Sequence, residues 1–196
     1  MTKEMAKPRG RPRKFDPEQA VSVAQGLFHA RGYDEVSVAD VTNAVGIKTP
    51  SFYAAFGSKV GLYERVIQRY ADHGAVPLKE LLSADRPVAD SLAAVLEEAA
   101  RRYGADPQAT GCIVLEGCGS NDREARMSAR AAHAVAESVI FDYIAARHPE
   151  QARELTEYIS TVMIGLSAKA RQGQSPGPLL STARMASRIL KSALSA

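Results

Sequence analysis

The side chains with the clearest chemical potential are the cations at the start of the chain. Residues 1–14 hold six lysines and arginines against one glutamate, a net charge of +5, whereas residues 15–75 carry −2 and residues 76–196 are balanced. A short cationic segment with few apolar residues is typical of a tail that contacts a polyanion such as DNA. A solubilising tail is the alternative interpretation.

Within this tail, Pro8-Arg9-Gly10-Arg11-Pro12 resembles the core of an AT-hook. Prolines hold such a segment extended, and glycine lets its backbone lie deep in a narrow groove. The resemblance implies that Arg9 and Arg11 meet the negative potential of an A·T-rich minor groove. If the tail supplies charge alone, it contacts all DNA sequences alike.

Two cysteines are the candidate nucleophiles or redox groups. Cys112 and Cys118 are six residues apart, and on one continuous helix they would lie ~9 Å apart on different faces, too far for a disulfide. Only a break at Gly117 would bring them together. Buried free thiols are therefore the favoured interpretation, and a redox switch is the alternative.

Catalytic and metal-binding patterns are absent from the sequence. His29, His73 and His148 have no neighbouring ligand pattern, so we expect neither a metal nor a cofactor, and no enzyme motif occurs. His133 is the histidine with two alternative roles, because its ring would either cap a core or line a cavity. An enzyme using Cys118 or His133 is a disfavoured alternative.

Composition sets the class of protein. The chain has 196 residues, of which 45% are hydrophobic and 24% charged, as in ordinary globular proteins of one domain or two small ones. No apolar stretch approaches the roughly 18 residues of a membrane span, and no apolar segment of a secretory signal follows the basic start. We expect a cytoplasmic protein with no membrane partner.

The elements that position these residues are predicted to be helices. Asp16-Pro17 with Gln19 is the pattern of an N-cap, a first-turn proline and a capping-box partner, and predicts a helix over 17–31. Ser37 with Asp40 repeats the capping pattern and begins a short helix that Gly46 ends.

A third helix is predicted from Thr49-Pro50 as N-cap and first-turn pair, with Phe52 and Phe56 on one face. Gly57 ends it, and Ser58 caps a longer helix that carries an apolar stripe of Leu62, Val66, Ile67 and Tyr70.

Two short helices joined by Val45-Gly46-Ile47 after a preceding helix form a helix-turn-helix arrangement. With the two phenylalanines turned inward, the outer face would offer a cation, hydroxyls and a phenol to phosphates and base edges. These are Lys48, Thr49, Ser51, Tyr53 and Ala55. A generic helix pair is the alternative.

Three segments within residues 15–70 carry a family resemblance: VSVADV at 36–41, AVGI at 44–47 and SFYAAFGSK at 51–59. They resemble the DNA-binding domain of TetR/AcrR-type transcriptional regulators. The resemblance implies an all-α fold with a three-helix helix-turn-helix domain and a C-terminal helical bundle. It also implies a recognition helix bearing Lys48, Thr49, Pro50, Ser51, Tyr53 and Ala55, with Ser37 and Lys59 on phosphates. Ala55 departs from the family pattern, where a polar residue is frequent, and leaves a methyl for a thymine.

The rest of the chain is predicted to be a helical bundle. Helices are expected over 87–103, over 122–146 with Ser120 or Asn121 as cap, through Leu155 to Leu166, and after Ser175-Pro176, with a short buried segment over 112–116. The predicted organisation is a basic arm at 1–14, a DNA-binding domain at 15–71 and a ligand-binding and dimerisation domain at 72–196.

A pocket for an effector is predicted from residues that interrupt helices of alanine and aliphatic residues with aromatic, thioether and polar groups. They are Tyr103, Cys112, Glu116, Met127, His133, Phe141 and Met163. Each is equally consistent with a core position.

A dimer interface is predicted from an apolar stripe on the last helix, with small residues of the preceding one. Its residues are Leu166, Leu179, Ala183, Ala186, Ile189, Leu190 and Ala193. Completion of the subunit's own core is the alternative. Two-fold symmetry would place the recognition helices about 34–36 Å apart and require a palindromic operator.

The sequence therefore predicts a homodimeric transcriptional regulator, most readily a repressor, that binds double-stranded operator DNA and is released by a small-molecule effector. A DNA-architectural protein without an effector is the alternative from another class.

Overall fold

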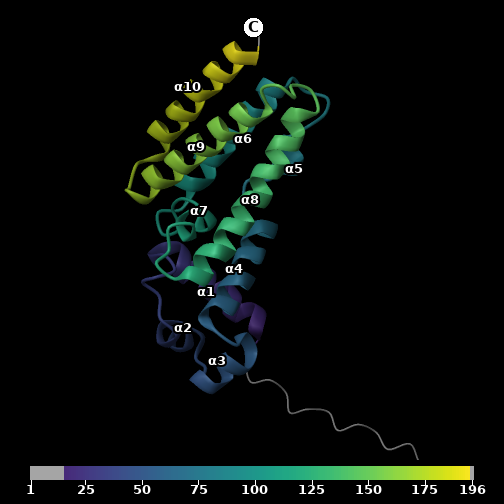
Figure 1. Cartoon of the computed structure of the whole chain (residues 1–196). Helices are drawn as coiled ribbons and strands as arrows, with labels where there is room; N and C mark the ends of the chain where they lie inside the picture. Colours follow the sequence, from purple (N-terminus) through teal and green to yellow (C-terminus); the bar gives the residue numbers. More distant parts are fainter. Residues whose placement is uncertain (1–15, 195–196) are drawn as a thin grey trace, which may run out of the picture.

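The computed structural model describes residues 16–194, which fold into ten α-helices with no strand (Figure 1). The expected all-α fold is confirmed. The helices are α1 Pro17–Arg31, α2 Val38–Val45, α3 Thr49–Phe56, α4 Lys59–His73, α5 Leu78–Leu81, α6 Val88–Ala105, α7 Ile113–Gly117, α8 Arg123–Ala145, α9 Ala152–Arg171 and α10 Pro176–Leu194. The arm with Arg9 and Arg11 lies outside the described residues.

Local capping accounts for the first two helices. Asp16 accepts a hydrogen bond from the Glu18 amide at 2.9 Å, one position before the partner Gln19 that the sequence predicted. Ser37 and Asp40 form the reciprocal capping box, in which the Asp40 amide donates to Ser37 Oγ at 3.1 Å and the Ser37 amide donates to Asp40 Oδ2 at 2.8 Å. Both helices therefore begin where the sequence predicted.

The turn between α2 and α3 places the third helix. Gly46 adopts the left-handed conformation, with φ 73° and ψ 35°, which ends α2 at little steric cost for glycine. The N-cap of α3 is Lys48 and not Thr49, because Lys48 keeps extended backbone while its carbonyl already accepts from the amides of Ser51 and Phe52. Thr49 and Pro50 are therefore the first two residues of the helix.

One apolar core runs through the molecule from α1 to α10. Figure 1 shows α1 to α3 at one end, α6, α9 and α10 side by side at the other, and α4 and α8 along the length between them. The predicted domain boundary at residue 71 falls inside α4, so this helix belongs to both parts.

Two details of the bundle differ from the sequence prediction. Asp122, rather than Ser120 or Asn121, caps α8 by accepting from the amides of Glu124 and Ala125 at 2.9 and 3.0 Å. The four-residue helix α5 was not predicted, because four residues are too few to show a helical period.

The predicted dimer-interface residues divide between the core of the subunit and its surface. Leu179, Ala183, Ala186 and Leu190 of α10 and Leu166 of α9 are buried where α10 lies along α6 and α9. Leu166, Leu179 and Ala186 also line an outer groove. Ile189 and Ala193 remain exposed. The period of a stripe shows that a helix face is covered, but not which helix covers it.

Candidate DNA-binding face and effector cavity

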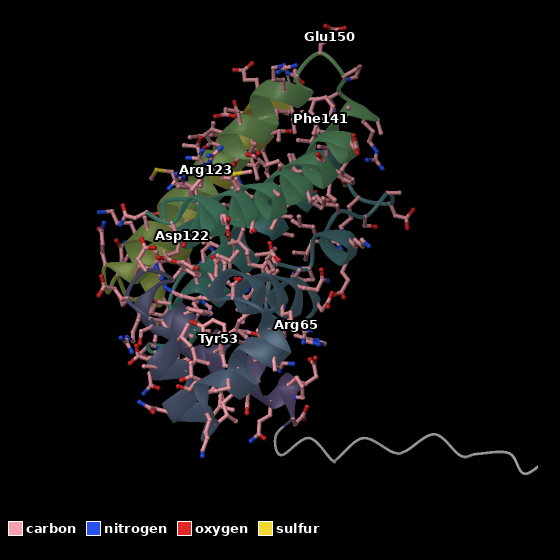
Figure 2. All side chains as sticks on the ribbon, turned by 60° about the horizontal axis from the view of Figure 1, so that its bottom comes forward. Tyr53, Arg65, Asp122, Arg123, Phe141 and Glu150 are labelled. Carbon is pink, nitrogen blue, oxygen red and sulfur yellow. The ribbon has the colours of Figure 1, made fainter. Side chains whose placement is uncertain are left out.

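The outer face of α3 is open to solvent. Thr49, Pro50, Ser51 and Tyr53 are exposed, as is the preceding Lys48, whereas Phe52 and Phe56 are buried. Tyr53 is 50% exposed and stands edge-on to the Phe52 ring, with 5.3 Å between ring centroids (Figure 2). Ala55 is half-buried against the core, so it offers less surface than the sequence suggested.

The two predicted phosphate ligands are already engaged within the subunit. Ser37 Oγ donates to Asp40 Oδ2 at 2.6 Å, and these hydrogen bonds lower the pKa of Asp40 to about 2. Lys59 Nζ lies 3.9 Å from the centre of the Tyr33 ring, and burial lowers its pKa. Ser37 is exposed, as the outer α3 residues are, whereas Lys59 is half-buried.

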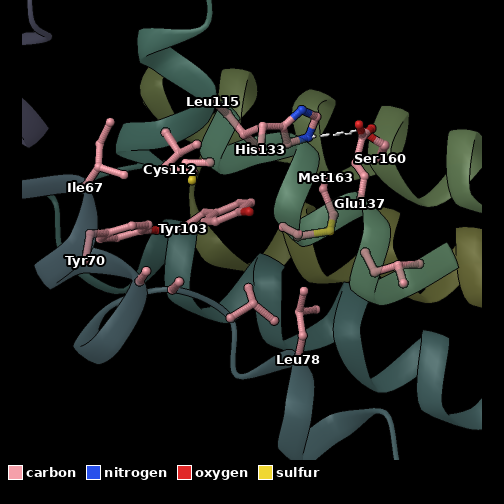
Figure 3. A pocket seen from close by; sticks show the side chains of 17 residues that line it. Ile67, Tyr70, Leu78, Tyr103, Cys112, Leu115, His133, Glu137, Ser160 and Met163 are labelled. Atoms are coloured by element: carbon pink, nitrogen blue, oxygen red, sulfur yellow. Dashed lines mark hydrogen bonds and ion pairs between the residues drawn. The ribbon is translucent and has the colours of Figure 1, made fainter. Parts of the chain in front are cut away.

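A cavity of about 130 Å³ lies where α4, α7, α8 and α9 meet. Four of the predicted pocket residues line it, namely Tyr103, Cys112, His133 and Met163 (Figure 3). The sequence analysis missed the α4 residues Ile67, Tyr70 and Ala71, the loop and α5 residues Val76 and Leu78, and Glu137 and Ser160. Ile67 and Tyr70 were assigned to a core stripe, and periodicity alone does not separate core from cavity wall.

Three predicted pocket residues lie elsewhere. Met127 and Phe141 are 59% and 39% exposed, because α8 presents only one side to the cavity. Glu116 instead faces the α1 end, where a Cβ at Gly32 would collide with its carboxylate. Its Oε2 lies 3.9 Å from Arg171 Nη2, and burial raises the pKa of this carboxyl group.

Polar groups at the cavity fall into two sets, on opposite sides of the view in Figure 3. Cys112 lies with Tyr70 and Tyr103; burial raises the pKa of all three, and hydrogen bonding to the tyrosines offsets only part of the rise for the thiol. His133 Nε2 lies 3.3 Å from Ser160 Oγ and 3.8 Å from Glu137 Oε1. Both cysteines are free thiols.

α1 and the loop that follows it are joined to the bundle by a polar junction near α7. His29 Nε2 lies 3.0 Å from the Gly111 carbonyl, and Arg171 Nη1 donates to the carbonyls of His29 at 2.9 Å and Thr110 at 3.0 Å. Asp34 accepts from Ser120 Oγ at 2.6 Å. Sequence reasoning missed this junction because its partners are far apart in the chain.

A groove runs along the outer faces of α9 and α10. It is lined in part by Val162, Gly165, Met185 and Ile189, and a Cβ at Gly165 would meet no atom of the subunit within 4 Å. Met185 and Ile189 are 57% and 54% exposed. Met185 and Ile189 therefore form an apolar surface on α10 that no other part of the single chain covers.

Residues 20–66 match the model of the bacterial regulatory proteins of the tetR family. Over 194 residues, 99% of this chain and 98% of the relative, the sequence is 52% identical to the HTH-type transcriptional repressor BdcR of Escherichia coli (strain K12). The chain belongs to the TetR family. The resemblance drawn from residues 15–70 is therefore confirmed, and the chain is a TetR-family transcriptional regulator.

Two further relatives extend over most of the chain. The HTH-type transcriptional repressor ComR of Escherichia coli (strain K12) is 28% identical over 193 residues, 93% of this chain and 92% of that protein. The structure of a cysteine mutant of the TetR family transcriptional regulator CifR, complexed with 26 bp double-strand operator DNA, is 29% identical with a TM-score of 0.78. It covers 91% of this chain and 98% of that chain.

Neither a membrane-spanning helix nor a cluster of metal ligands occurs within residues 16–194. No helix there is both long and apolar enough to cross a membrane. The same residues contain no group of three or more His, Cys, Asp and Glu side chains arranged to hold a metal ion.

Proposed function

We propose that the chain is a homodimeric repressor that binds a palindromic operator through α3 and is released when a small molecule occupies the cavity. The observation that carries this proposal is the course of α4. Its N-cap, Ser58, follows directly after α3, and three of its residues, Ile67, Tyr70 and Ala71, line the cavity. One rigid helix therefore has one end at the DNA-reading helix and another part at the ligand.

Release requires that the effector bind the DNA-incompetent arrangement more tightly than the competent one. A ligand that displaces Tyr70 or Ala71 would move the start of α4, and with it α3. By linkage, effector and operator then weaken each other's binding by the same factor.

The sign of regulation and the DNA partner are supported by the relatives. BdcR and ComR are named transcriptional repressors, and CifR has been solved on double-strand operator DNA. Thr49, Ser51 and Tyr53 would read base edges of such an operator, while Lys48 contacts a phosphate. With DNA as partner, the site of action is the cytoplasm.

The homodimer is supported by the groove on α9 and α10. Its exposed residues Met185 and Ile189 are large apolar side chains, and Gly165 lets a partner helix approach closely. A two-fold copy of this face would cover the apolar surface of both subunits. Of the predicted interface residues, Leu166, Leu179, Ala186 and Ile189 line this groove, whereas Ala183 and Leu190 lie in the core.

An enzymatic role for Cys118 or His133 is disfavoured. Burial raises the pKa of the Cys118 thiol, which keeps it in the protonated, weakly nucleophilic form. We therefore propose that the chain is not an enzyme.

The test is selection of bound sequences from a random duplex library, followed by footprinting on the selected DNA. We expect a palindromic footprint, with affinity that falls steeply as salt rises. Binding with no sequence selectivity would instead indicate the architectural DNA-binding protein.

A further inference from the structure

The chemistry of the cavity wall restricts the charge of its ligand. Among the described residues that line the cavity, Glu137 is the sole carboxylate, and neither lysine nor arginine occurs. An anion that entered this cavity would lose hydration, and His133 in its protonated form is the one lining side chain among the described residues that would offset the loss as a cation. A carboxylate or phosphate ligand would in addition meet the carboxylate of Glu137.

A cationic ligand fits little better. Glu137 already lies 3.8 Å from His133 Nε2, and its side chain is 34% exposed, so its attraction for a ligand ammonium is screened by water. The remaining wall is mostly aliphatic and aromatic, including Ile67, Leu78, Leu115 and Ile140. An ammonium would lose most of its hydration against this surface.

The size of the cavity restricts the ligand further. A volume of about 130 Å³ is available, close to that of an apolar protein cavity of about 150 Å³ that binds benzene. The cavity therefore accommodates the body of a molecule of about one aromatic ring.

Besides the Glu137 carboxylate, the polar groups leave one place for a directional contact. Cys112 is paired with Tyr70 and Tyr103, and all three are held protonated by burial. His133 and Ser160, at 3.3 Å, together present a hydroxyl and a ring nitrogen that can donate to or accept from one further group.

We propose that the cavity binds a small uncharged molecule with an apolar body of about one ring and a single hydroxyl or carbonyl group that pairs with His133 and Ser160. This ligand class rests on the proposed function, in which the cavity holds the effector.

The test uses probes that share a ring and differ in charge: benzyl alcohol, benzoate, benzylamine and toluene, titrated calorimetrically into the full-length protein at pH 7. We expect benzyl alcohol to bind at least tenfold more tightly than benzoate or benzylamine. Equal or tighter binding of either ion, or no binding of benzyl alcohol, would overturn the proposed class.

Three variants locate the binding. Ala136→Leu adds a larger side chain to the cavity wall and should weaken benzyl alcohol at least tenfold, whereas Ala134→Leu, on the exposed side of α8, should leave it unchanged. Ser160→Ala should weaken benzyl alcohol about threefold to tenfold without weakening toluene. Unchanged binding to Ala136→Leu would exclude this cavity as the site, and thermal melting checks that each variant folds.

Operator binding separates this inference from the function on which it rests. If the alcohol binds as expected but leaves operator affinity unchanged, the ligand class stands and the release mechanism fails. If the probes do not bind while the protein still recognises a palindromic operator, the ligand class fails and DNA recognition stands.

Discussion

Tyr53 combines exposure with a fixed position. Half of its surface is open, and its ring rests edge-on against buried Phe52, so its hydroxyl is presented from a rigid base. Tyr53→Phe removes the hydroxyl and retains the ring. We expect operator affinity, measured by fluorescence anisotropy, to fall about tenfold, with little change on random-sequence duplex. Equal losses on both duplexes would argue against base readout by Tyr53.

The ionisation of Asp40 makes the stabilisation of the folded state by the α2 capping box depend on pH. The hydrogen bonds from Ser37 lower its pKa from 3.8 to about 2, so the carboxylate stabilises the folded state above about pH 4 and loses that contribution as the pH falls toward 2. Asp40→Asn should lower the Tm at pH 7, and the difference from the natural chain should shrink between pH 4 and pH 2. A Tm difference that is independent of pH would contradict the role of the charge.

Arg11 is predicted from sequence alone to enter a minor groove. Arg11→Lys keeps the charge but replaces guanidinium by the more strongly hydrated ammonium. Affinity should therefore fall more for operators with A·T-rich flanks than for those with G·C-rich flanks. Identical losses of affinity on both kinds of flank would mean that the arm contributes charge alone.

At the scale of helices, a hydrogen bond from Arg171 joins the C-terminal end of α9 to the C-terminal end of α1. Among the hydrogen bonds described for residues 16–194, Arg171 alone bridges the His29 and Thr110 carbonyls, and its guanidinium also approaches the half-buried Glu116 carboxylate. A lysine has no planar fork for two carbonyls. We expect Arg171→Lys to cost about 2 kcal/mol, a Tm decrease of roughly 4–8 °C.

Arg153→Lys, an exposed change on the same helix, is the matched control and should leave the Tm within about 1 °C. Equal Tm values for the two variants would mean that the junction contributes little to stability.

At the scale of the whole molecule, the proposed homodimer depends on the exposed apolar residues Met185 and Ile189 of α10. Met185→Glu with Ile189→Glu should give monomers in sedimentation experiments and lower operator affinity at least 100-fold, since a monomer reads only one half-site. Met127→Glu, at an exposed methionine of α8, should remain a dimer. If the double variant remains dimeric, this face is not the dimer interface. Substitution of buried Leu190 would instead test folding.

The sequence by itself determined the local features of this protein. The bounds of α1, the capping box at Ser37 and the turn at Gly46 follow from residues within a few positions of one another, and the family resemblance lies in the same stretch. The N-cap of α3 is Lys48 and not the predicted Thr49. No side chain forms a cap hydrogen bond here, so backbone conformation rather than side-chain type decides which residue is the N-cap.

The tertiary structure decided what each apolar face meets. Met127 and Phe141 point outward while His133, on the same helix, lines the cavity, and Leu190 turns inward while Ile189 turns outward. Helical periodicity shows how much of a helix is covered, but the covering partner is chosen by contacts between residues far apart in the chain. The hydrogen bonds of Arg171 and the walls of the cavity arise from such contacts. Their geometry therefore follows from the packing of the helices and not from the local sequence.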